Sequence, residues 1–320
     1  MRASKDNQPR VGHVKRISNH SQIIGIDIGG TKIKMVALSS EGDEVARRTC
    51  KTNDHPGSDI PAFAKTVRQI LNRFPENSRL RVGIASPGLV SKNGRSIAFQ
   101  SGKMHGIEGF DWTDFLQMRN AVPVLNDAHA ALLGEVWKGA AQGCQNAIML
   151  TLGTGVGGAI MSDGRLLKGT IGRAGHLGHV SIGLRGERSI FGMPGALETA
   201  IGNYTLARRS GGRFNSTEEL VKAYLAGDAV ASRIWLKSVQ ALARAIASFI
   251  NCLDPEAVVV GGGVAQAGAA LFDPLNRYLD DLEWRPGGHR VRILRGALGE
   301  WAGAYGAARS AMQVWKNLEA

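Results

Sequence analysis

The sequence predicts an α/β protein built from two similar domains with a cleft between them. A strand, a glycine turn and a second strand are expected at residues 22–38, and the same pattern returns at residues 146–161. Each copy is followed by alternating helical and strand-like segments, which favours a duplicated α/β architecture. A chain of 320 residues is also long for a single core, so about two domains are expected.

The first copy is expected to form the smaller domain, opening with an antiparallel meander of three strands. Helices are predicted after this meander, where apolar residues recur at helical spacing, and from about residue 128 to residue 141. The residues with helical spacing are Phe63, Val67, Ile70, Leu71 and Phe74. The strands are predicted at residues 22–28, 33–37, 45–51, 80–85 and 122–125.

The second copy is expected to form the larger domain. A helix-rich section is predicted from about residue 197 to residue 251, and a helix at about 301–318 closes the chain. The strands are predicted at residues 146–152, 157–161, 166–168, 258–263 and 291–297. We therefore place the first domain at residues 22–127 and the second at residues 128–304. The closing helix, about residues 305–320, is expected to pack on the first domain.

The net charge of +12 is concentrated partly at the N-terminus. Residues 1–21 are polar, basic and without apolar periodicity, so we expect a flexible tail. A basic balance suits anionic ligands such as nucleoside triphosphates. Neither a helix-turn-helix pattern nor zinc-finger spacing is present, so no nucleic-acid partner is expected.

Other features of the sequence indicate a cytoplasmic protein. No apolar run approaches the ~18 residues needed to cross a membrane, and the N-terminus lacks the apolar core of a signal peptide. The cysteines, Cys50, Cys144 and Cys252, are widely spaced and form neither a disulfide framework nor a CxxC metal pattern. We expect no membrane partner.

Three glycine-rich turns each follow a predicted strand: DIGGTK (27–32), TLGTGVGG (151–158) and VVVGGGVAQAG (258–268). Glycine allows successive backbone N–H groups to point at one anion, and Thr and Lys side chains add donors and charge. A single such turn is weak support, because any hairpin can use Gly-Gly. Three together favour phosphate binding, although none has the spacing of a P-loop.

Asn126 and Asp127 lie between a predicted strand and a predicted helix. Asp127 at this junction could simply cap the helix. A carboxylate in this position could also accept the proton of a hydroxyl group during phosphoryl transfer. The stretch GRAGHLGHV (172–180) is equally open, since His176 and His179 could bind a metal, recognise a sugar or have no function.

The order and spacing of these motifs resemble the ROK family (repressors, open reading frames and sugar kinases) of the actin-like ATPase superfamily. The resemblance covers about residues 22–312. It rests on the three glycine turns, Asn126-Asp127-Ala128, Gly134-Glu135 and residues 175–179. It implies two actin-like, ribonuclease H-like α/β domains and a glucokinase-like enzyme that transfers phosphate from Mg²⁺-ATP to the 6-hydroxyl of a hexose. The implied partners are ATP and a hexose, with glucose as the default, and a homodimer is possible.

The resemblance also assigns roles to individual residues. Asp27 would help to place Mg²⁺, and Asp127 would be the general base. Asn126, His176, His179 and Glu198 would contact the sugar together with Asp127. The ATP phosphates and adenosine would contact Asp27, Gly29, Gly30, Thr31, Lys32, Thr154, Gly155, Gly262 and Gly263.

The chain departs from the family pattern in its metal motif. Relatives hold a structural zinc with the loop His and three Cys, whereas the matching positions here are Ser189, Phe191 and Ala196. Phe and Ala cannot bind a metal, and a structural zinc needs four ligands. We therefore expect no zinc, and apolar packing by Phe191, Ala196 and their neighbours is expected to hold the loop instead.

The sugar motif departs as well. His176 stands where the family has Glu, and residues 102–112 replace the family's Asn-Leu-x-x-Trp segment. Neutral imidazole offers one donor and one acceptor, so an altered sugar preference is expected. A sugar- or nucleotide-binding protein without turnover stays an alternative. A transcriptional regulator is disfavoured, because only 21 residues precede the first predicted strand.

Overall fold

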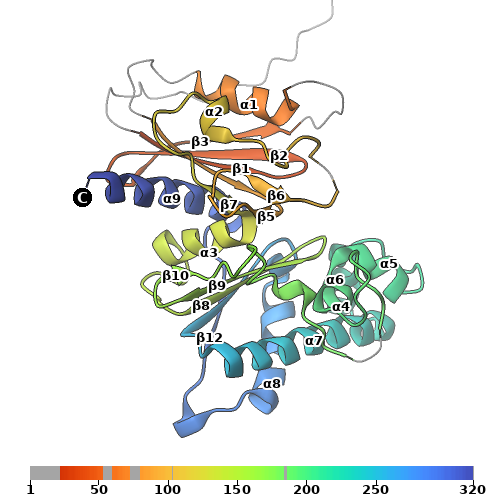
Figure 1. Cartoon of the computed structure of the whole chain (residues 1–320). Coiled ribbons are helices and arrows are strands. Elements are labelled where there is room, and N and C mark those ends of the chain that lie inside the picture. The colour runs from red at the N-terminus through yellow and green to blue at the C-terminus, as the bar shows by residue number, and fades with distance from the viewer. Residues whose placement is uncertain (1–21, 53–59, 73–79, 103, 184–185, 320) are drawn as a thin grey trace, which may run out of the picture.

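The computed structural model describes residues 22–52, 60–72, 80–102, 104–183 and 186–319. The predicted N-terminal tail, Phe74, Lys103 and Ala320 therefore lie outside the described residues. Two five-stranded sheets lie one above the other in Figure 1, each with helices of its own. We call the first sheet with its helices the N-terminal lobe and the second sheet with its helices the C-terminal lobe.

The N-terminal sheet has the strand order β3-β2-β1-β4-β7. Strands β1, β2 and β3 form the predicted antiparallel meander, while β4 and β7 run parallel to β1. The strands span β1 Gln22–Ile28, β2 Lys32–Leu38, β3 Glu44–Lys51, β4 Leu80–Ser86 and β7 Val124–Asn126. A separate strand pair, β5 Leu89–Val90 and β6 Ile97–Phe99, follows β4 and was not predicted.

The C-terminal sheet repeats this topology, with the order β10-β9-β8-β11-β12. Again three antiparallel strands are followed by two that run parallel to the first strand of the set. The strands span β8 Ala147–Leu152, β9 Val156–Ser162, β10 Arg165–Leu166, β11 Ala257–Gly261 and β12 Arg292–Arg295. The predicted duplicated α/β fold is confirmed.

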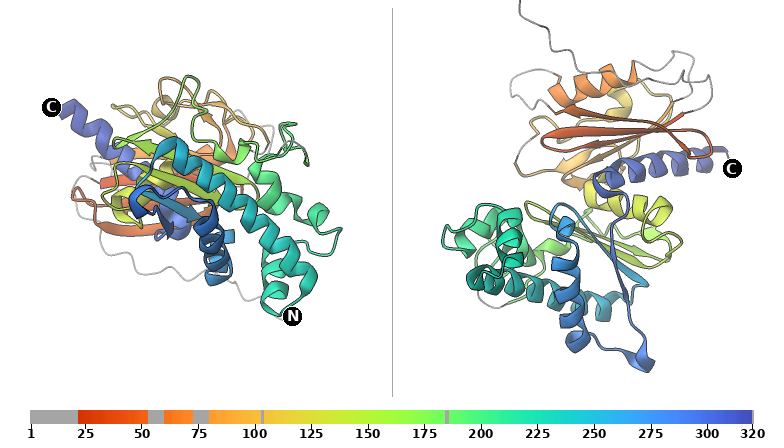
Figure 2. Two further views of the ribbon diagram at one scale, coloured as in Figure 1. Left: turned by 90° about the horizontal axis from the view of Figure 1, so that it is seen from below. Right: turned by 180° about the vertical axis from the view of Figure 1, so that it is seen from behind.

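The helices form layers on both sheets. Helices α1 and α2 cover the outer face of the N-terminal sheet, and α7 and α8 lie beyond the C-terminal sheet (Figure 1). Helices α3 and α9 lie between the sheets, where they pack on each other, as the view from behind in Figure 2 also shows. The helices span α1 Ala62–Leu71, α2 Trp112–Phe115, α3 Asp127–Lys138, α4 Leu197–Ile201, α5 Leu206–Arg209, α6 Thr217–Leu225, α7 Ala229–Leu253, α8 Ala269–Leu282 and α9 Ala302–Glu319.

Helix α9 lies directly on strands of the N-terminal sheet, although it is the last helix of the chain. Glycines in β1 and β4 allow its backbone to come this close. A Cβ at Gly25 would lie 1.9 Å from the carbonyl oxygen of Ala304, and one at Gly83 would lie 2.1 Å from that of Ala307. The apolar face of α9 therefore packs on the sheet at Gly25 and Gly83, where no side chain separates the helix from the strands.

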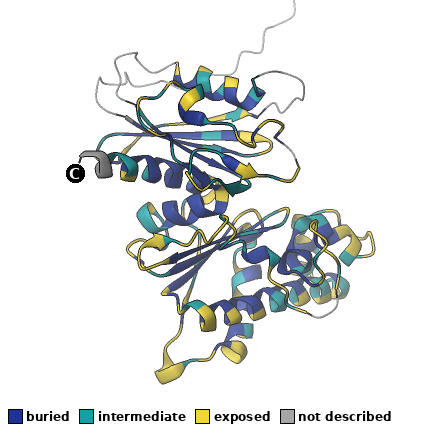
Figure 3. Cartoon of the chain, in the orientation of Figure 1, coloured by how far each residue is buried: buried dark blue, intermediate teal, exposed yellow. Residues whose placement is uncertain are grey.

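Buried residues run along the strands of both sheets and along α3 and α9 (Figure 3). The N-terminal core includes Trp112, which is fully buried with its ring centroid 5.9 Å from that of Phe63. Trp112 belongs to the segment that replaces the family's sugar motif. Its burial gives it a packing role in the core of the N-terminal lobe.

Candidate active site

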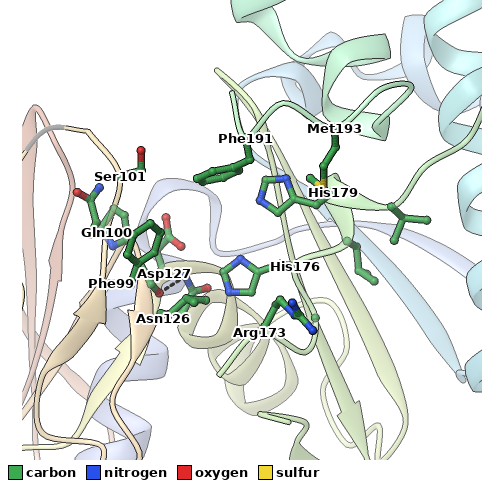
Figure 4. Close-up of a pocket in the computed structure, with 16 residues that line it drawn as sticks. Phe99, Gln100, Ser101, Asn126, Asp127, Arg173, His176, His179, Phe191 and Met193 are labelled. Carbon is green, nitrogen blue, oxygen red and sulfur yellow. Dashed lines mark hydrogen bonds between the residues drawn. The ribbon is translucent and has the colours of Figure 1, made fainter. Parts of the chain in front are cut away.

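A pocket of about 750 Å³ lies between the two lobes. Its walls come from the loop after β4, the end of β6, the β7–α3 junction, the histidine stretch and the loop before α4. In Figure 4, Asp127 and Phe99 lie on one side of the pocket, with His176 and His179 on the other. The predicted sugar-site residues Asn126, Asp127, His176 and His179 are among those that line it.

The β7–α3 junction fixes the position of Asp127. Asn126 is the residue that caps α3, since its Oδ1 accepts hydrogen bonds from the amides of Ala128 (2.9 Å) and His129 (3.3 Å). The capping alternative given for Asp127 therefore belongs to its neighbour. Asn126 Nδ2 donates to the carbonyl oxygen of Gly88 (3.1 Å), so one of its two N–H groups is used within the protein.

Asp127 is open to the pocket, and its Oδ1 accepts a hydrogen bond from the Ala128 amide at 2.8 Å. The lobes surround it closely, and this partial removal from bulk water raises the pKa of its carboxyl group above the ordinary value. The hydrogen bond from Ala128 acts in the opposite direction. A raised pKa makes the carboxylate a better proton acceptor, as a general base requires.

Asp27 is the second-last residue of β1 and faces Lys34 across the hairpin, with Oδ2 3.5 Å from Lys34 Nζ. Burial raises the pKa of Asp27 to about 6, and the ammonium group of Lys34 opposes this rise. The charge of Asp127 raises the same pKa further, so the two carboxylates lie within electrostatic reach of each other.

Lys34 was not among the predicted site residues, which included Lys32 instead. Lys32 begins β2 and is exposed, whereas the Lys34 side chain is only 19% exposed and is paired with Asp27. No clear signal in the sequence pointed to Lys34, because a two-residue turn at Gly29-Gly30 would place Lys32 opposite Asp27. The observed connection spans residues 29–32, and this register pairs Lys34 with Asp27.

The first glycine turn is a tight connection between β1 and β2. The Gly29 amide donates to the carbonyl oxygen of Lys32 (3.0 Å), and the Thr52 amide donates to that of Thr31 (3.0 Å). Gly30, Thr31 and Lys32 are exposed. The turn is thus held on one side by Thr52, which follows β3, while residues 30–32 are exposed on the other side. An exposed glycine turn of this kind suits contact with an anion.

The second and third glycine turns meet at another pocket, of about 790 Å³, in the C-terminal lobe. Thr154 and Gly263 both line it, together with residues of α6. Gly263 has open space around its Cα, whereas a Cβ at Gly262 would lie 2.3 Å from the Leu152 carbonyl oxygen, and Gly262 has a φ of +85°. Gly262 therefore allows the turn to pass close to β8, and Gly263 is the glycine that leaves room in the pocket.

The histidine stretch forms a row of rings along the C-terminal side of the first pocket. The ring centroids of His176 and His179 are 6.2 Å apart and nearly parallel, and His129 of α3 lies 6.2 Å from His176. Burial lowers the pKa of His176 to about 4, with the neighbouring His129 and His179 acting in the same direction. His176 is therefore neutral at pH 7. Among the described residues, its buried Nε2 has no hydrogen-bond partner.

Glu198 lies behind His179, which lines this pocket. It is buried in α4, with Oε1 3.3 Å from the hydroxyl of Tyr204 and 3.6 Å from Nδ1 of His179. A Cβ at Gly155 would lie 2.9 Å from its Oε2. Glu198 thus connects the histidine row with the second glycine turn and is not among the residues that line the first pocket.

The loop that matches the family's zinc motif is ordered by a serine. Ser189 Oγ accepts hydrogen bonds from the amides of Phe191 (3.2 Å) and Met193 (3.3 Å). Phe191 is 45% exposed and stands edge-on to His179, with centroids 5.0 Å apart. Ala196 is fully buried, in keeping with the expected apolar packing of this loop, and the hydrogen bonds to Ser189 add to it. In the described part of the chain no three His, Cys, Asp or Glu residues are grouped to hold a metal ion.

Comparison with known proteins identifies the family. The sequence model described as the ROK family matches residues 23–314, nearly the whole chain. The chain belongs to the ROK family. The resemblance seen in the sequence is thereby confirmed, and the actin-like fold agrees with that of solved ROK structures.

Several ROK proteins are similar to this chain over most of its length. A glucokinase of Thermotoga maritima is 32% identical over 90% of this chain and 96% of its own. An N-acetylmannosamine kinase of Citrobacter koseri is 33% identical over 76% of this chain and 84% of its own. The structure of a ROK family glucokinase from Streptomyces griseus in complex with glucose and AMPPNP has a TM-score of 0.72 and 28% identity, and the match covers 92% of this chain and all of that one.

Within this ROK chain, none of the described helices is both long and apolar enough to pass through a membrane. Most of the predicted site residues lie at the first pocket, at the second pocket or in the open first turn, whereas Asp27, Gly155, Glu198 and Gly262 line neither pocket. Residues 29–32 line neither of the two pockets described. Whether these groups act together at one site stays a prediction.

Proposed function

We propose that this protein is a sugar kinase that transfers the terminal phosphate of Mg²⁺-ATP to the 6-hydroxyl of a hexose. The observation that carries the proposal is the position of Asp127, whose carboxyl group has a raised pKa and lines the interlobe pocket. The glycine turns of the two lobes are of the kind that binds ATP. The similarity to kinases of glucose and of N-acetylmannosamine supports the reaction class and leaves glucose as the default substrate.

In the proposed reaction Asp127 accepts the proton of the 6-hydroxyl while the sugar oxygen bonds to the terminal phosphorus. The bond from that phosphorus to the bridging oxygen breaks at the same time, and ADP leaves. Asn126 can still donate one N–H to a neighbouring sugar hydroxyl. Because little covalent chemistry falls to the protein, alignment and electrostatics would supply most of the rate.

The proposed ATP site combines the second pocket with the first glycine turn. Gly263 would leave space for the adenosine, and Thr154, which lines the same pocket, would face the phosphates together with the adjacent Gly155. Gly29, Gly30, Thr31 and Lys32 would meet them from the other lobe. Closure of the cleft would bring the two sets together.

Magnesium would enter with ATP and would neutralise charge on the phosphates. Asp27 fits this cation, since a carboxylate is a preferred magnesium ligand and the position of Asp27 near Asp127 concentrates negative charge there. Lys34 holds Asp27 in place from the neighbouring strand.

The reaction is tested by measuring ADP release from Mg²⁺-ATP with a panel of hexoses and amino sugars. The proposal predicts turnover with at least one sugar. ATP and sugar binding without any ADP release would instead support the alternative, a binding protein without turnover.

The role of Asp127 is tested by Asp127→Asn, which removes the proton acceptor and keeps the shape. We expect kcat to fall by at least about a hundredfold while ATP binding is retained, since general-base catalysis contributes about 10²–10⁴-fold. Asp273→Asn, an exposed aspartate of α8, is the matched control and should keep full activity. A largely active Asp127→Asn enzyme would refute this role.

A further inference from the structure

A third pocket, of about 330 Å³, lies between the lobes and has no part in the proposed reaction. Its walls come from the β5–β6 pair and β7 of the N-terminal lobe, from α3, and from the loop at residues 168–172 of the C-terminal lobe. Its volume lies at the lower end of the range of about 300–1,000 Å³ that is typical of small-molecule sites.

The β5–β6 pair separates this pocket from the first one. Leu89 and Phe99 line the first pocket, whereas their neighbours Val90 and Ala98 line the third. Successive residues of a strand point to opposite faces, so the two pockets lie on opposite faces of this pair. The two linings have no residue in common. The third pocket is therefore a separate site and not an extension of the candidate active site.

Each lobe contributes a lysine to the third pocket, which we call the lysine pocket. Lys92 follows β5 in the N-terminal lobe, and Lys168 follows β10 in the C-terminal lobe. Both side chains are exposed, and neither forms an ion pair with a described residue. No aspartate or glutamate is among the described residues that line the pocket. Two cations without a carboxylate create a positive potential that attracts an anion.

The charge of Lys168 also acts on the inner wall of the lysine pocket. His129 of α3 is buried in this wall, with Nε2 3.1 Å from the carbonyl oxygen of Ala174. Burial lowers the pKa of His129, and the charge of Lys168 acts in the same direction. His129 is therefore neutral at pH 7, and the positive charge in the pocket comes from the two lysines.

The loop of the C-terminal lobe adds backbone donors next to Lys168. The Ala174 amide closes this loop by donating to the carbonyl oxygen of Lys168 at 3.2 Å. Within the described part of the chain, the amides of residues 169–172 donate no hydrogen bond. Uncommitted amides beside a lysine are the kind of donors that phosphate-binding loops use.

The size of the charge favours a phosphate group over a carboxylate. A phosphate ester carries a charge of about −1.5 to −2 at pH 7, which matches two lysines, whereas a carboxylate carries one negative charge. Apolar side chains also line the lysine pocket, among them Val90, Leu125 and Ile171, and Ile171 is 51% exposed. This apolar part favours an organic phosphate over the free phosphate ion.

We propose that the lysine pocket binds a small organic phosphate. Lys92 and Lys168 hold the phosphate group from the two lobes, and Val90 and Ile171 contact the organic part. Such a ligand links the lobes outside the candidate active site. This inference goes beyond the proposed function and does not depend on it, since binding can be measured without any phosphoryl transfer.

The site is tested by isothermal titration calorimetry with phenyl phosphate in the absence of ATP and sugar. The wild type should bind it, and Lys92→Gln and Lys168→Gln should each weaken binding about five- to tenfold, because each removes a charge-assisted contact. Lys65→Gln is the matched control, since exposed Lys65 of α1 does not line the pocket. Absence of binding would overturn the proposal. Binding that neither lysine substitution weakens would lie elsewhere, such as at the glycine turns, and would overturn it too.

The organic part of the ligand is tested by a second titration with inorganic phosphate. The wild type should bind phenyl phosphate more tightly, and equal affinities would overturn the assignment of an organic ligand. Ile171→Ala should weaken phenyl phosphate about three- to fivefold and leave inorganic phosphate unchanged. Ile190→Ala is the control, because Ile190 is 64% exposed and does not line the lysine pocket. Thermal melting of each variant establishes that it is folded.

Discussion

At the scale of single residues, the Asp27–Lys34 pair shows how the fold raises the pKa of a carboxyl group. The two residues lie opposite each other in β1 and β2, and a Cβ at Gly303 of α9 would lie 2.9 Å from the Asp27 carboxyl carbon. Helix α9 thus closes over the pair and removes it from water. Removal from water, opposed by the Lys34 charge, sets the pKa of Asp27 at about 6.

This pKa predicts a pH-dependent contribution to stability. A carboxyl group whose pKa rises from 3.8 to about 6 on folding binds more protons in the folded state within that interval. The free energy of unfolding should therefore fall as pH rises through it. Relative to Asp27→Asn, which cannot titrate, the wild type should lose about 1–3 kcal/mol between about pH 4 and pH 7.

The measurement is urea denaturation of both proteins across this pH range. The value near pH 4 serves as the reference, because the folded forms of both proteins carry a neutral side chain at position 27 there. A difference between the two that is constant from pH 4 to pH 7 would contradict the raised pKa.

At the scale of elements, the crossing of α3 and α9 depends on two glycines. A Cβ at Gly134 of α3 would lie 2.4 Å from the carbonyl oxygen of Ala302, and one at Gly306 of α9 would lie 1.7 Å from that of Ala130. The helices can therefore approach backbone to backbone. This crossing is the direct contact between the layers of the two sheets.

The crossing predicts that Gly306→Ala destabilises the protein against the trend of helix propensity. Alanine is the better helix former by about 1 kcal/mol, so propensity alone predicts a gain. The clash with Ala130 predicts instead a loss of at least about 3 kcal/mol, measured by thermal or urea unfolding. Gly153→Ala is the matched control, because its Cβ would meet open space, and it should change stability by less than about 0.5 kcal/mol. A rise in Tm for Gly306→Ala would refute the close crossing.

The elements also show what could be predicted from the sequence. Most strands and the helices α1, α3, α7 and α9 followed from apolar periodicity and glycine turns, because those signals are local, whereas α8 was not predicted. The resemblance directed attention to Asp127, which the structure places in the pocket, while its role stays a prediction. The contact of Glu198 with Gly155 and the β5–β6 pair that carries Phe99 were not predicted. They depend on how segments distant in sequence pack, and no local pattern encodes that.

At the scale of the whole molecule, one buried carboxylate joins α3 to the segment that leads back into α9. Glu135 accepts hydrogen bonds from the amides of Ala140 (2.7 Å), Ala297 (3.0 Å) and Leu298 (2.9 Å). It is fully buried. Through these three hydrogen bonds, the Glu135 side chain joins the end of α3 to the segment that leads into α9.

Glu135→Gln should weaken this junction by about 2 kcal/mol or more, because an amide nitrogen cannot accept a hydrogen bond and leaves a buried donor unpaired. Urea denaturation measures the loss, and hydrogen exchange should show faster exchange at the Ala297 and Leu298 amides. Glu256→Gln is the control, since exposed Glu256 also accepts two backbone amides but in contact with water. Equal losses for the two variants would mean that burial of Glu135 adds nothing.

The return of α9 to the first sheet has a consequence for biosynthesis. Ile23, Val36 and Leu38 of β1 and β2 are covered by α9 residues such as Ala304 and Ala308. A ribosome makes the end of β1, Ile28, about 270 residues before the start of α9, Ala302. The nascent chain must therefore keep an apolar sheet face uncovered through most of translation, and the first lobe can complete its core only when the last helix emerges.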